Sequence, residues 1–148
     1  MKTELVRDWM TPEPVCANPQ MNLPEAHKLM KDHRIRRLPV VDRDKLVGIV
    51  TRGDIRGAQP SEATSLSIYE LNYLLGRLTL ARIMTRDPVT IMPEATIGEA
   101  ARLMLRHKIA GLPVVEGGRV VGILTESDVF RLLVEAWEAE EAAALEYA

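Results

Sequence analysis

The spacing of hydrophobic residues first predicts two amphipathic helices. Over Leu23–Met30, and again over Ile97–Met104, apolar side chains recur every three or four positions and so share one helical face. Each run follows a residue that caps helices, Asn22 or Thr96, with a glutamate three positions further on. That is the spacing of a capping box, in which side chains satisfy the free backbone amides of a helix start. We therefore expect a helix at each place.

Two short apolar runs follow each of these helices and predict a hairpin. The first pair, Leu38–Val41 and Leu46–Val50, is rich in valine and isoleucine and encloses a polar tetrapeptide. The second pair is similar and encloses Glu116–Arg119. Short extended runs at Pro14–Ala17 and Pro88–Met92 precede the first helices, and a further helix follows each hairpin. Each unit is thus expected to be β-α-β-β-α.

These elements occur twice because the chain is an internal duplication. Met10 matches Met84, an offset of 74 residues, and the same offset places Leu38–Val41 on Leu112–Val115 without a gap. Two copies are too few for a solenoid. We therefore expect two like units packed as a pseudo-two-fold pair.

The remaining segments complete a four-part division of the chain. Between the repeats, a polar linker at Gly57–Ala63 precedes a predicted helix at Leu66–Leu75, and Val129–Tyr147 predicts a long acidic helix. In the linker helix we expect four residues to be available for packing: Leu66, Tyr69, Tyr73 and Leu74. The predicted parts are repeat 1 (1–58), a linker with a helix (59–79), repeat 2 (80–134) and an acidic helical tail (135–148).

Composition narrows the classes of function. The 148 residues are 47% apolar and 27% charged, as in soluble globular proteins. A formal net charge of −2 gives no basic field for nucleic-acid binding. The single cysteine, Cys16, cannot form an internal disulfide, and no signal peptide or run long enough for a membrane helix is visible. We expect a cytoplasmic protein that binds neither nucleic acid nor membrane.

The motif with the most chemistry closes each hairpin: GIVTRGD at Gly48–Asp54 and GILTESD at Gly122–Asp128. Threonine followed by an acidic residue three positions on is an ordinary helix cap. However, the other caps of this chain use glutamate, whereas this motif twice uses the shorter aspartate, which we expect to point outward. Strand ends beside helix starts also hold phosphates and ribose hydroxyls. The residues alone leave a cap and a ligand site equally open.

The full succession resembles a tandem pair of CBS domains, also called a Bateman module. It consists of M-T-x-x-P-V, a helix, L-P-V-V and G-h-h-T-x-x-D, present twice, and it covers Leu5–Leu133. The resemblance implies an α+β fold of two repeats with a central ligand cleft. It also implies binding of AMP, ADP, ATP, S-adenosylmethionine or NAD(H) to regulate another protein. With no enzyme attached, the chain is similar to stand-alone bacterial proteins of the acetoin-utilisation type.

The resemblance assigns one ligand site to each repeat, with the same kinds of contact. A carboxylate would bind the ribose hydroxyls, a threonine a phosphate or the sugar, an isoleucine the base, and a Pro-Val pair of the opposite repeat the adenine. In this order, the residues of the first site are Asp54, Thr51, Ile49, Pro88 and Val89. Those of the second site are Asp128, Thr125, Ile123, Pro14 and Val15.

A basic stretch distinguishes the first repeat, which has H-R-I-R-R at His33–Arg37 where the second has H-K-I-A-G. Cations suit a helix C-terminus, so a solvated helix end is one interpretation. The other is a phosphate clamp, because the resemblance implies a phosphate-binding cation at Arg36, with Arg37 beside it and Arg52 nearby, and arginine bonds phosphate strongly. On that interpretation the Asp54 site prefers charged phosphates and the Asp128 site offers them less.

Other candidate sites have weaker support. His33 and His107 recur at one place without a second metal ligand at suitable spacing, so we expect a structural role. Cys16 is expected in a strand of the core, with no orienting group for a catalytic pair. We expect no catalytic residue, no metal and no catalytic cofactor.

The expected function is a non-enzymatic sensor that binds an adenine nucleotide (AMP or ATP) or S-adenosylmethionine and modulates an unknown partner protein. Because the ligand would bridge both repeats, it would favour one inter-repeat geometry. A homodimer is expected, since related modules commonly pair. The alternatives are a protein-interaction or dimerisation module with vestigial ligand sites and, third, a nucleotide hydrolase.

Overall fold

The computed structural model describes residues 3–60 and 65–147, which form two compact units. The first unit is Pro14–Pro88, and the second combines Met1–Glu13 with Val89–Ala148. Each unit therefore holds the body of one repeat together with the Met-Thr segment that opens the other repeat. The domain boundaries, the pseudo-two-fold arrangement and the ligand cleft expected from the sequence stay predictions.

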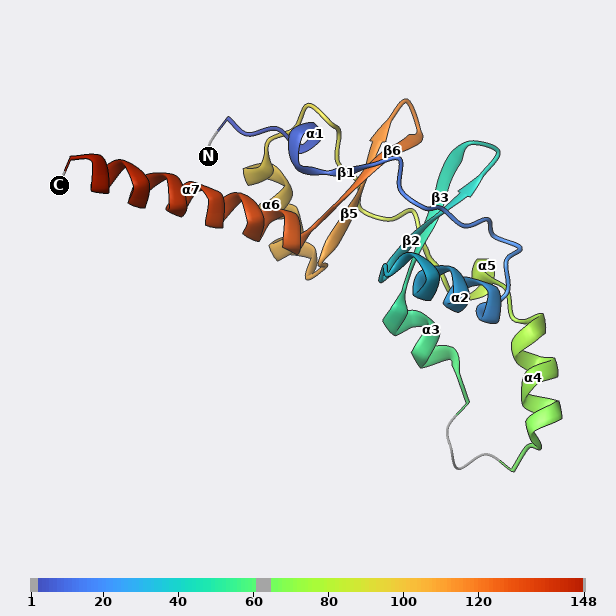
Figure 1. Cartoon of the computed structure of the whole chain (residues 1–148). Helices are drawn as coiled ribbons and strands as arrows, with labels where there is room; N and C mark the ends of the chain where they lie inside the picture. The colour runs from blue at the N-terminus through green and yellow to red at the C-terminus, as the bar shows by residue number, and fades with distance from the viewer. Residues whose placement is uncertain (1–2, 61–64, 148) are drawn as a thin grey trace. The chain divides into compact units, whose positions relative to one another are not determined.

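In its described residues, the first unit is a three-stranded antiparallel sheet with four helices (Figure 1). The strand order is β2-β3-β4. The elements in chain order are α2 (Leu23–His33), β2 (Arg37–Asp42), β3 (Lys45–Thr51), α3 (Arg52–Ala58), α4 (Ile68–Arg77), α5 (Leu80–Ile83) and β4 (Thr85–Arg86). The helices and the hairpin predicted here are confirmed.

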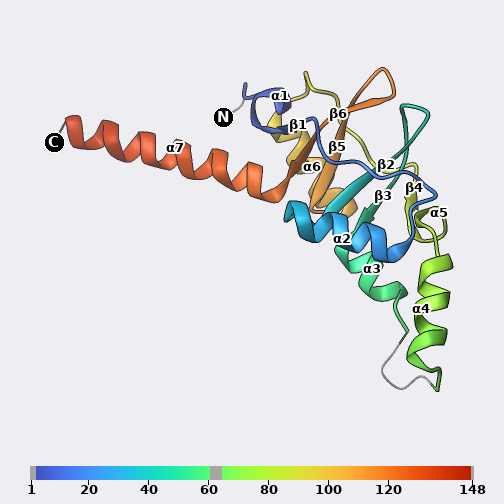
Figure 2. The ribbon, with the colours of Figure 1, turned by 45° about the vertical axis from the view of Figure 1, so that its right-hand side comes forward.

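The second unit repeats this plan with the strand order β1-β6-β5. Its elements are α1 (Val6–Trp9), β1 (Thr11–Pro12), α6 (Ile97–His107), β5 (Gly111–Glu116), β6 (Arg119–Thr125) and α7 (Glu126–Glu146). The predicted acidic helix is the continuation of the helix that starts at the second T-x-x-D motif. It has no buried residue beyond Leu132, and its C-terminal part extends away from the rest of its unit (Figure 2). Among the described residues, no helix combines the length and apolarity that crossing a membrane requires.

The extended runs expected at Pro14–Ala17 and Pro88–Met92 do not form full strands. Each segment contributes a single parallel bridge, Ala17 to Val40 and Ile91 to Val114. The third strand of each sheet is instead a two-residue strand that begins at the threonine of a Met-Thr segment, Thr11–Pro12 or Thr85–Arg86, and it comes from the start of the other repeat. Thus β1 pairs with β6, and β4 pairs with β3.

A glycine in each sheet explains why the methionine of that segment lies where it does. A Cβ atom on Gly48 would come within 2.5 Å of Met84 Sδ and 2.9 Å of the Thr85 carbonyl oxygen. A Cβ atom on Gly122 would clash in the same way with Met10. Because glycine has no side chain, the methionine can pack directly against the strand at this position. The Met-Thr motif of one repeat and the G-h-h-T motif of the other therefore contact each other.

Both hairpins close through two-residue turns whose central residues have positive φ. These are Arg43 (51°) and Asp44 (64°) in the first hairpin, and Gly117 (60°) and Gly118 (82°) in the second. Such turns match the right-handed twist of the strands, which is why glycine is favoured in them. The first hairpin holds two residues with side chains in the left-handed region, so it bears a steric cost that the second avoids.

Each unit has its own hydrophobic core between its sheet and helices. The fully buried side chains are alike in the two repeats, with Leu38, Val40 and Val50 in the first unit and Leu112, Val114 and Leu124 in the second. The expected packing of α4 is wrong in detail. Its contact with the core is made by Leu75, whereas Tyr69 and Tyr73 are 84% and 61% exposed.

Candidate functional site

The T-x-x-D motif of the first unit is a closed helix cap. The Asp54 amide donates to Thr51 Oγ1 at 3.1 Å, and the Thr51 amide donates to Asp54 Oδ2 at 2.8 Å. In the second unit the Thr125 amide donates to Asp128 Oδ2 at 2.9 Å. The expectation that these aspartates point outward is wrong, because each reaches back to its N-cap residue. One carboxylate oxygen of each is committed to the helix start.

The two carboxylates differ in their second oxygen. Asp128 is only 6% exposed, and its Oδ1 lies 3.4 Å from Arg131 Nη1. Arg131 is itself held in place, because its guanidinium lies over the Trp9 ring and donates to the Trp9 carbonyl oxygen. Asp54 is half-buried, and its Oδ1 has no hydrogen-bond or ion-pair partner among the residues that the structure describes. In the first repeat, the residue equivalent to Arg131 by the 74-residue offset is Gly57.

The other residues expected at the ligand sites lie within their units as follows. Ile49 and Ile123 are half-buried on the central strands, opposite Thr85 and Thr11 respectively. The Pro-Val pairs lie outside the strands; Val15 packs on the core of the first unit and Val89 on that of the second. Val89 and Asp54 belong to different units, as do Pro14 and Asp128, so the predicted base contacts stay predictions.

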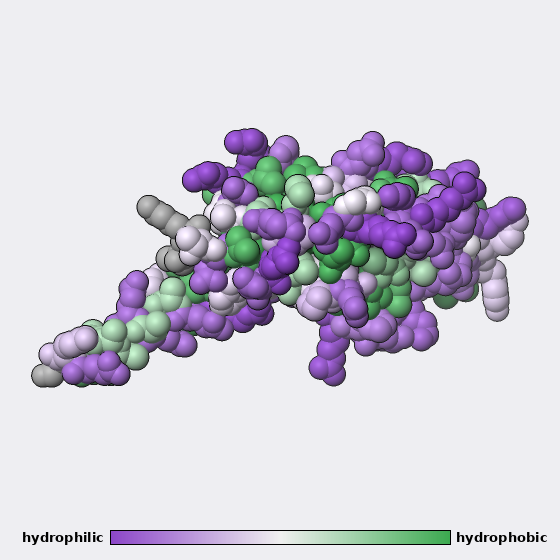
Figure 3. Space-filling view, turned by 90° about the horizontal axis from the view of Figure 1, so that it is seen from above, coloured by the Kyte–Doolittle hydropathy of each residue, from purple (hydrophilic) through white to green (hydrophobic). Residues whose placement is uncertain are grey.

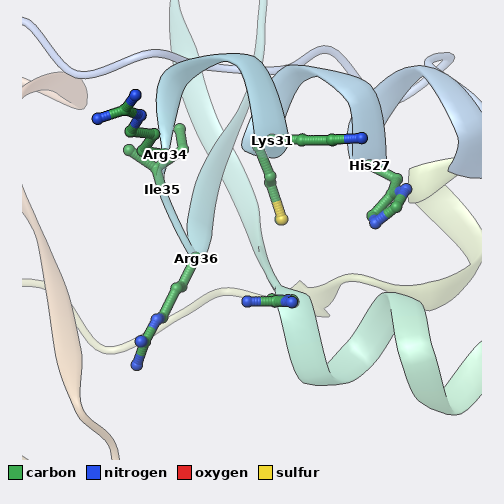
Figure 4. A pocket seen from close by; sticks show the side chains of 7 residues that line it. His27, Lys31, Arg34, Ile35 and Arg36 are labelled. Carbon is green, nitrogen blue, oxygen red and sulfur yellow. The ribbon is translucent and has the colours of Figure 1, made fainter.

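A basic pocket of about 480 Å³ opens beside the start of α3 in the first unit (Figure 4). Its lining comes from α2, the segment after it, and the first residue of α3: His27, Met30, Lys31, Arg34, Ile35, Arg36 and Arg52. The Arg52 amide donates to the Arg36 carbonyl oxygen at 2.8 Å, which holds the backbones of the two residues together. The expected proximity of Arg36 and Arg52 is confirmed. Neither Arg37 nor Asp54 lines this pocket.

Three basic residues of this pocket, His27, Lys31 and Arg34, were not singled out as site residues from the sequence. His27 and Lys31 are four residues apart on α2 and therefore share a face of that helix. Arg34 follows as the C-cap residue with a φ of 55°, which turns the chain back toward β2. The four-residue spacing of His27 and Lys31 is the feature of the sequence that could have predicted that both line one pocket.

The remaining candidates carry no chemistry that the structure supports. Cys16 lies outside any strand and is half-buried, which corrects its expected place in a core strand. Burial raises the pKa of its thiol, so the thiolate is disfavoured at neutral pH. His33 and His107 are exposed, and the described part of the chain contains no cluster of three or more potential metal ligands.

Comparison with known proteins gives one family for both repeats. The family model described as the CBS domain matches residues 6–61 and again residues 80–135. A CBS domain-containing protein of Dictyostelium discoideum is 35% identical over 136 residues, which are 90% of this chain and 94% of that protein. An inosine-5'-monophosphate dehydrogenase of Korarchaeum cryptofilum is 40% identical over 127 residues, which are 85% of this chain, but the chain spans only 22% of that enzyme.

Three solved structures resemble the whole chain. One, from Vibrio cholerae and provisionally described as an acetoin utilization protein (AcuB), has a TM-score of 0.75 and 34% identity, covering 93% of this chain and 96% of that one. The CBS domain pair of protein MJ0100, in complex with 5'-methylthioadenosine and S-adenosyl-L-methionine, has a TM-score of 0.76 and 33% identity, covering 90% and 98%. CBSX2 of Arabidopsis thaliana in complex with AMP has a TM-score of 0.74 and 28% identity, covering 90% and 98%.

Proposed function

We propose a regulatory function for this chain, which belongs to the CBS-domain family as a tandem pair of domains. In this proposal it binds an adenosine-containing ligand at Asp54 and transmits binding to a partner protein without catalysing a reaction. The complexes of similar CBS pairs with AMP and with S-adenosyl-L-methionine support this class of ligand.

The proposal depends on Asp54 Oδ1, the carboxylate oxygen that has no partner among the described residues. The helix cap uses Oδ2 and fixes the carboxylate, so Oδ1 is oriented in advance to accept hydrogen bonds from two ribose hydroxyls. Ile49, half-buried on the adjoining strand, offers an apolar contact for the base. Arg36 offers a cation for a phosphate. The Asp128 site is the weaker one, because a ribose there must displace Arg131 from Oδ1.

A non-enzymatic role agrees with the chemistry available at the first site. Its aspartate is held by the helix start, and the described residues supply neither an activated nucleophile nor a metal cluster beside it. The enzymes among the relatives match only through a minor part of their length, as the dehydrogenase does. Binding would then act by favouring the conformation that holds the ligand better.

Calorimetric titration with AMP, ATP, S-adenosylmethionine and NADH tests the proposal. We expect at least one of them to bind the wild type, and Asp54→Ala to weaken that binding at least about tenfold, the effect of losing charge-assisted hydrogen bonds. Asp128→Ala removes the equivalent cap from the other repeat and is the matched control. Absence of binding by all four compounds, or equal weakening by the two variants, would contradict the assignment. Release of a reaction product would contradict the non-enzymatic role.

A second candidate function is self-association through α7. Phe130, Val134 and Trp137 are 60%, 45% and 55% exposed, and their spacing places them on one face of the helix. The projecting end of the same helix mixes hydrophilic and weakly hydrophobic side chains (Figure 3). If this stripe joins two copies, the chain sediments as a dimer and Trp137→Glu yields a folded monomer. A wild-type monomer, or a dimer that survives the change, excludes this role for α7.

A further inference from the structure

The two units of the chain carry formal charges of opposite sign. By sequence, Pro14–Pro88 contains 12 basic and 8 acidic residues, a formal charge of +4. The other unit, Met1–Glu13 with Val89–Ala148, contains 7 basic and 13 acidic residues, a formal charge of −6. Surfaces of opposite charge attract one another and steer the encounter of two molecules. The places where each charge is concentrated therefore indicate how two copies would meet.

The negative charge of the second unit is concentrated on the C-terminal half of α7. Glu138, Glu140 and Glu141 are exposed, and in the part of the chain that the structure describes none of them is in an ion pair. Helical spacing places Glu141 in line with the exposed Trp137 and puts Glu138 and Glu140 on either side of it. This acidic face of α7, an apolar stripe with carboxylates beside it, is complementary to an apolar surface with cations beside it.

The basic pocket of the first unit is a surface of that kind. Met30 and Ile35 contribute its apolar lining, and its cations come from α2, the segment after it and the start of α3. No carboxylate lines it. Figure 4 shows Lys31, Arg34 and Arg36 extending in different directions, so the positive charge spreads around the hollow and does not meet at one point. This distribution suits the side of an acidic helix.

The second repeat has the same framework without this charge. Lys108 caps α6 with a φ of 54°, and the Glu126 amide donates to the Ala110 carbonyl oxygen at 3.0 Å. The residues that match the five basic ones, in chain order, are Ala101, Leu105, Lys108, Ala110 and Glu126. The fold therefore does not require the cations of the first repeat. An acidic helix is attracted to the first unit here and not to the equivalent place of the second.

Two copies of α7 are a poor match for each other. If the apolar stripes paired, the carboxylates of one helix would face those of the other, and like charges across an interface lower the affinity. The helix is nevertheless available to another molecule, because it has no buried residue beyond Leu132. From there to Glu146 it spans about 21 Å, which exceeds the length of α2, about 16 Å. The acidic face can therefore cover the whole basic pocket of a second copy.

From these observations we infer that α7 of one copy binds the basic pocket of a second copy, whose own α7 binds the pocket of the first. In this dimer Trp137 packs toward Ile35, and the glutamates beside it face Lys31 and Arg52. The pair is closed, since each copy offers one helix and one pocket. The inference rests on self-association through α7, the second candidate function, and names the surface that the helix contacts.

Reversing the charge of either surface tests the inference, with sedimentation equilibrium as the measurement. We expect the wild type to be a dimer that weakens as sodium chloride is raised. Lys31→Glu/Arg52→Glu makes both surfaces acidic, and Glu138→Lys/Glu141→Lys makes both basic. Each variant alone should therefore dimerise at least about tenfold more weakly than the wild type. Mixed in equal amounts, the two should form a heterodimer, because each acidic surface then meets a basic one.

The matched control is Arg77→Glu/Arg82→Glu, which makes the same change of charge in the first unit outside the pocket. Both arginines are exposed, and the control should change the dissociation constant of the dimer less than about threefold. The four residues replaced in the test variants are exposed as well, and Arg52→Glu installs the residue of the second repeat. Circular dichroism verifies the fold of each variant.

The outcomes separate failure of this pairing from failure of self-association through α7. A wild-type monomer overturns both. A dimer that Trp137→Glu dissociates but Lys31→Glu/Arg52→Glu leaves intact overturns the pairing alone, because α7 then contacts another surface. Absence of a heterodimer in the mixture, or assemblies that grow beyond a dimer with concentration, overturns the reciprocal arrangement. An equal loss in the control variant overturns the role of the pocket, since it indicates general charge repulsion.

Discussion

Arg131 Nη1 lies 3.4 Å from Asp128 Oδ1, whereas the equivalent aspartate, Asp54, has a glycine, Gly57, at the position of that arginine. The same motif is therefore occupied by the protein itself in one repeat and open in the other. The stacking of Arg131 on Trp9 strengthens the difference, because Ile83 stands at the position that matches Trp9. We therefore expect the two copies of the motif to differ in their capacity for a ligand.

The first prediction is that Gly57→Arg closes the Asp54 site. A Cβ atom on Gly57 meets nothing within 4 Å, so the new side chain fits, and it stands three residues from Asp54 on the same helix. We expect the affinity for the adenosine ligand to fall about three- to tenfold, the effect of a partly exposed ion pair. Calorimetry measures it. Gly57→Ala is the control, since it changes helix propensity without adding charge, and a similar loss there would refute the ion-pair explanation.

The second prediction is the reverse change, Arg131→Ala, which frees Asp128 Oδ1. A second binding event should appear in the titration of the wild-type ligand, or the stoichiometry should rise. Arg131→Lys keeps the charge but loses the planar stacking on Trp9, so it should free the site less completely. An unchanged stoichiometry in Arg131→Ala would show that something other than this ion pair separates the two sites.

The local elements were predictable because local signals determine them. Asn22 and Thr96 cap their helices as the spacing indicates, with the Glu25 and Glu99 amides donating to their side chains. The hairpins follow from alternating apolar runs around short polar turns. The pairing of the third strands, β1 and β4, could not be predicted from the sequence. Both repeats carry the same methionine and the same glycine, so the sequence does not say that Met10 packs on Gly122 rather than on Gly48.

The candidate site was predictable only in part. Motif spacing made Asp54 and Asp128 the candidates, but the difference between their surroundings depends on Arg131 and on the distant Trp9, which only the fold brings together. The basic pocket likewise combines Lys31 and Arg52, which lie on two helices separated by a hairpin. In both cases the missing information is a contact between elements, which periodicity does not encode.

A third prediction concerns the glycine beneath each methionine. Gly48→Ala and Gly122→Ala should each destabilise the protein by about 1–3 kcal/mol, the usual cost of overpacking, since the new methyl group collides with Met84 or Met10. Urea unfolding measures the change. Gly76→Ala in α4 is the matched control, because its Cβ atom meets nothing within 4 Å and alanine favours the helix; it should stabilise by about 0.5–1 kcal/mol. Equal stability of the three variants would contradict the packing contact.

The last prediction concerns the turn of the first hairpin. Asp44 has a φ of 64°, whereas the second hairpin has Gly118 at the matching position. Asp44→Gly should therefore stabilise the protein by up to about 1 kcal/mol, because it removes steric strain in the left-handed region. Gly118→Asp should destabilise the other hairpin by a similar amount, while leaving ligand binding at Asp54 intact. Thermal unfolding and AMP titration of both variants provide the measurement. A loss of stability in Asp44→Gly would show that the aspartate side chain contributes more to the turn than its backbone strain costs.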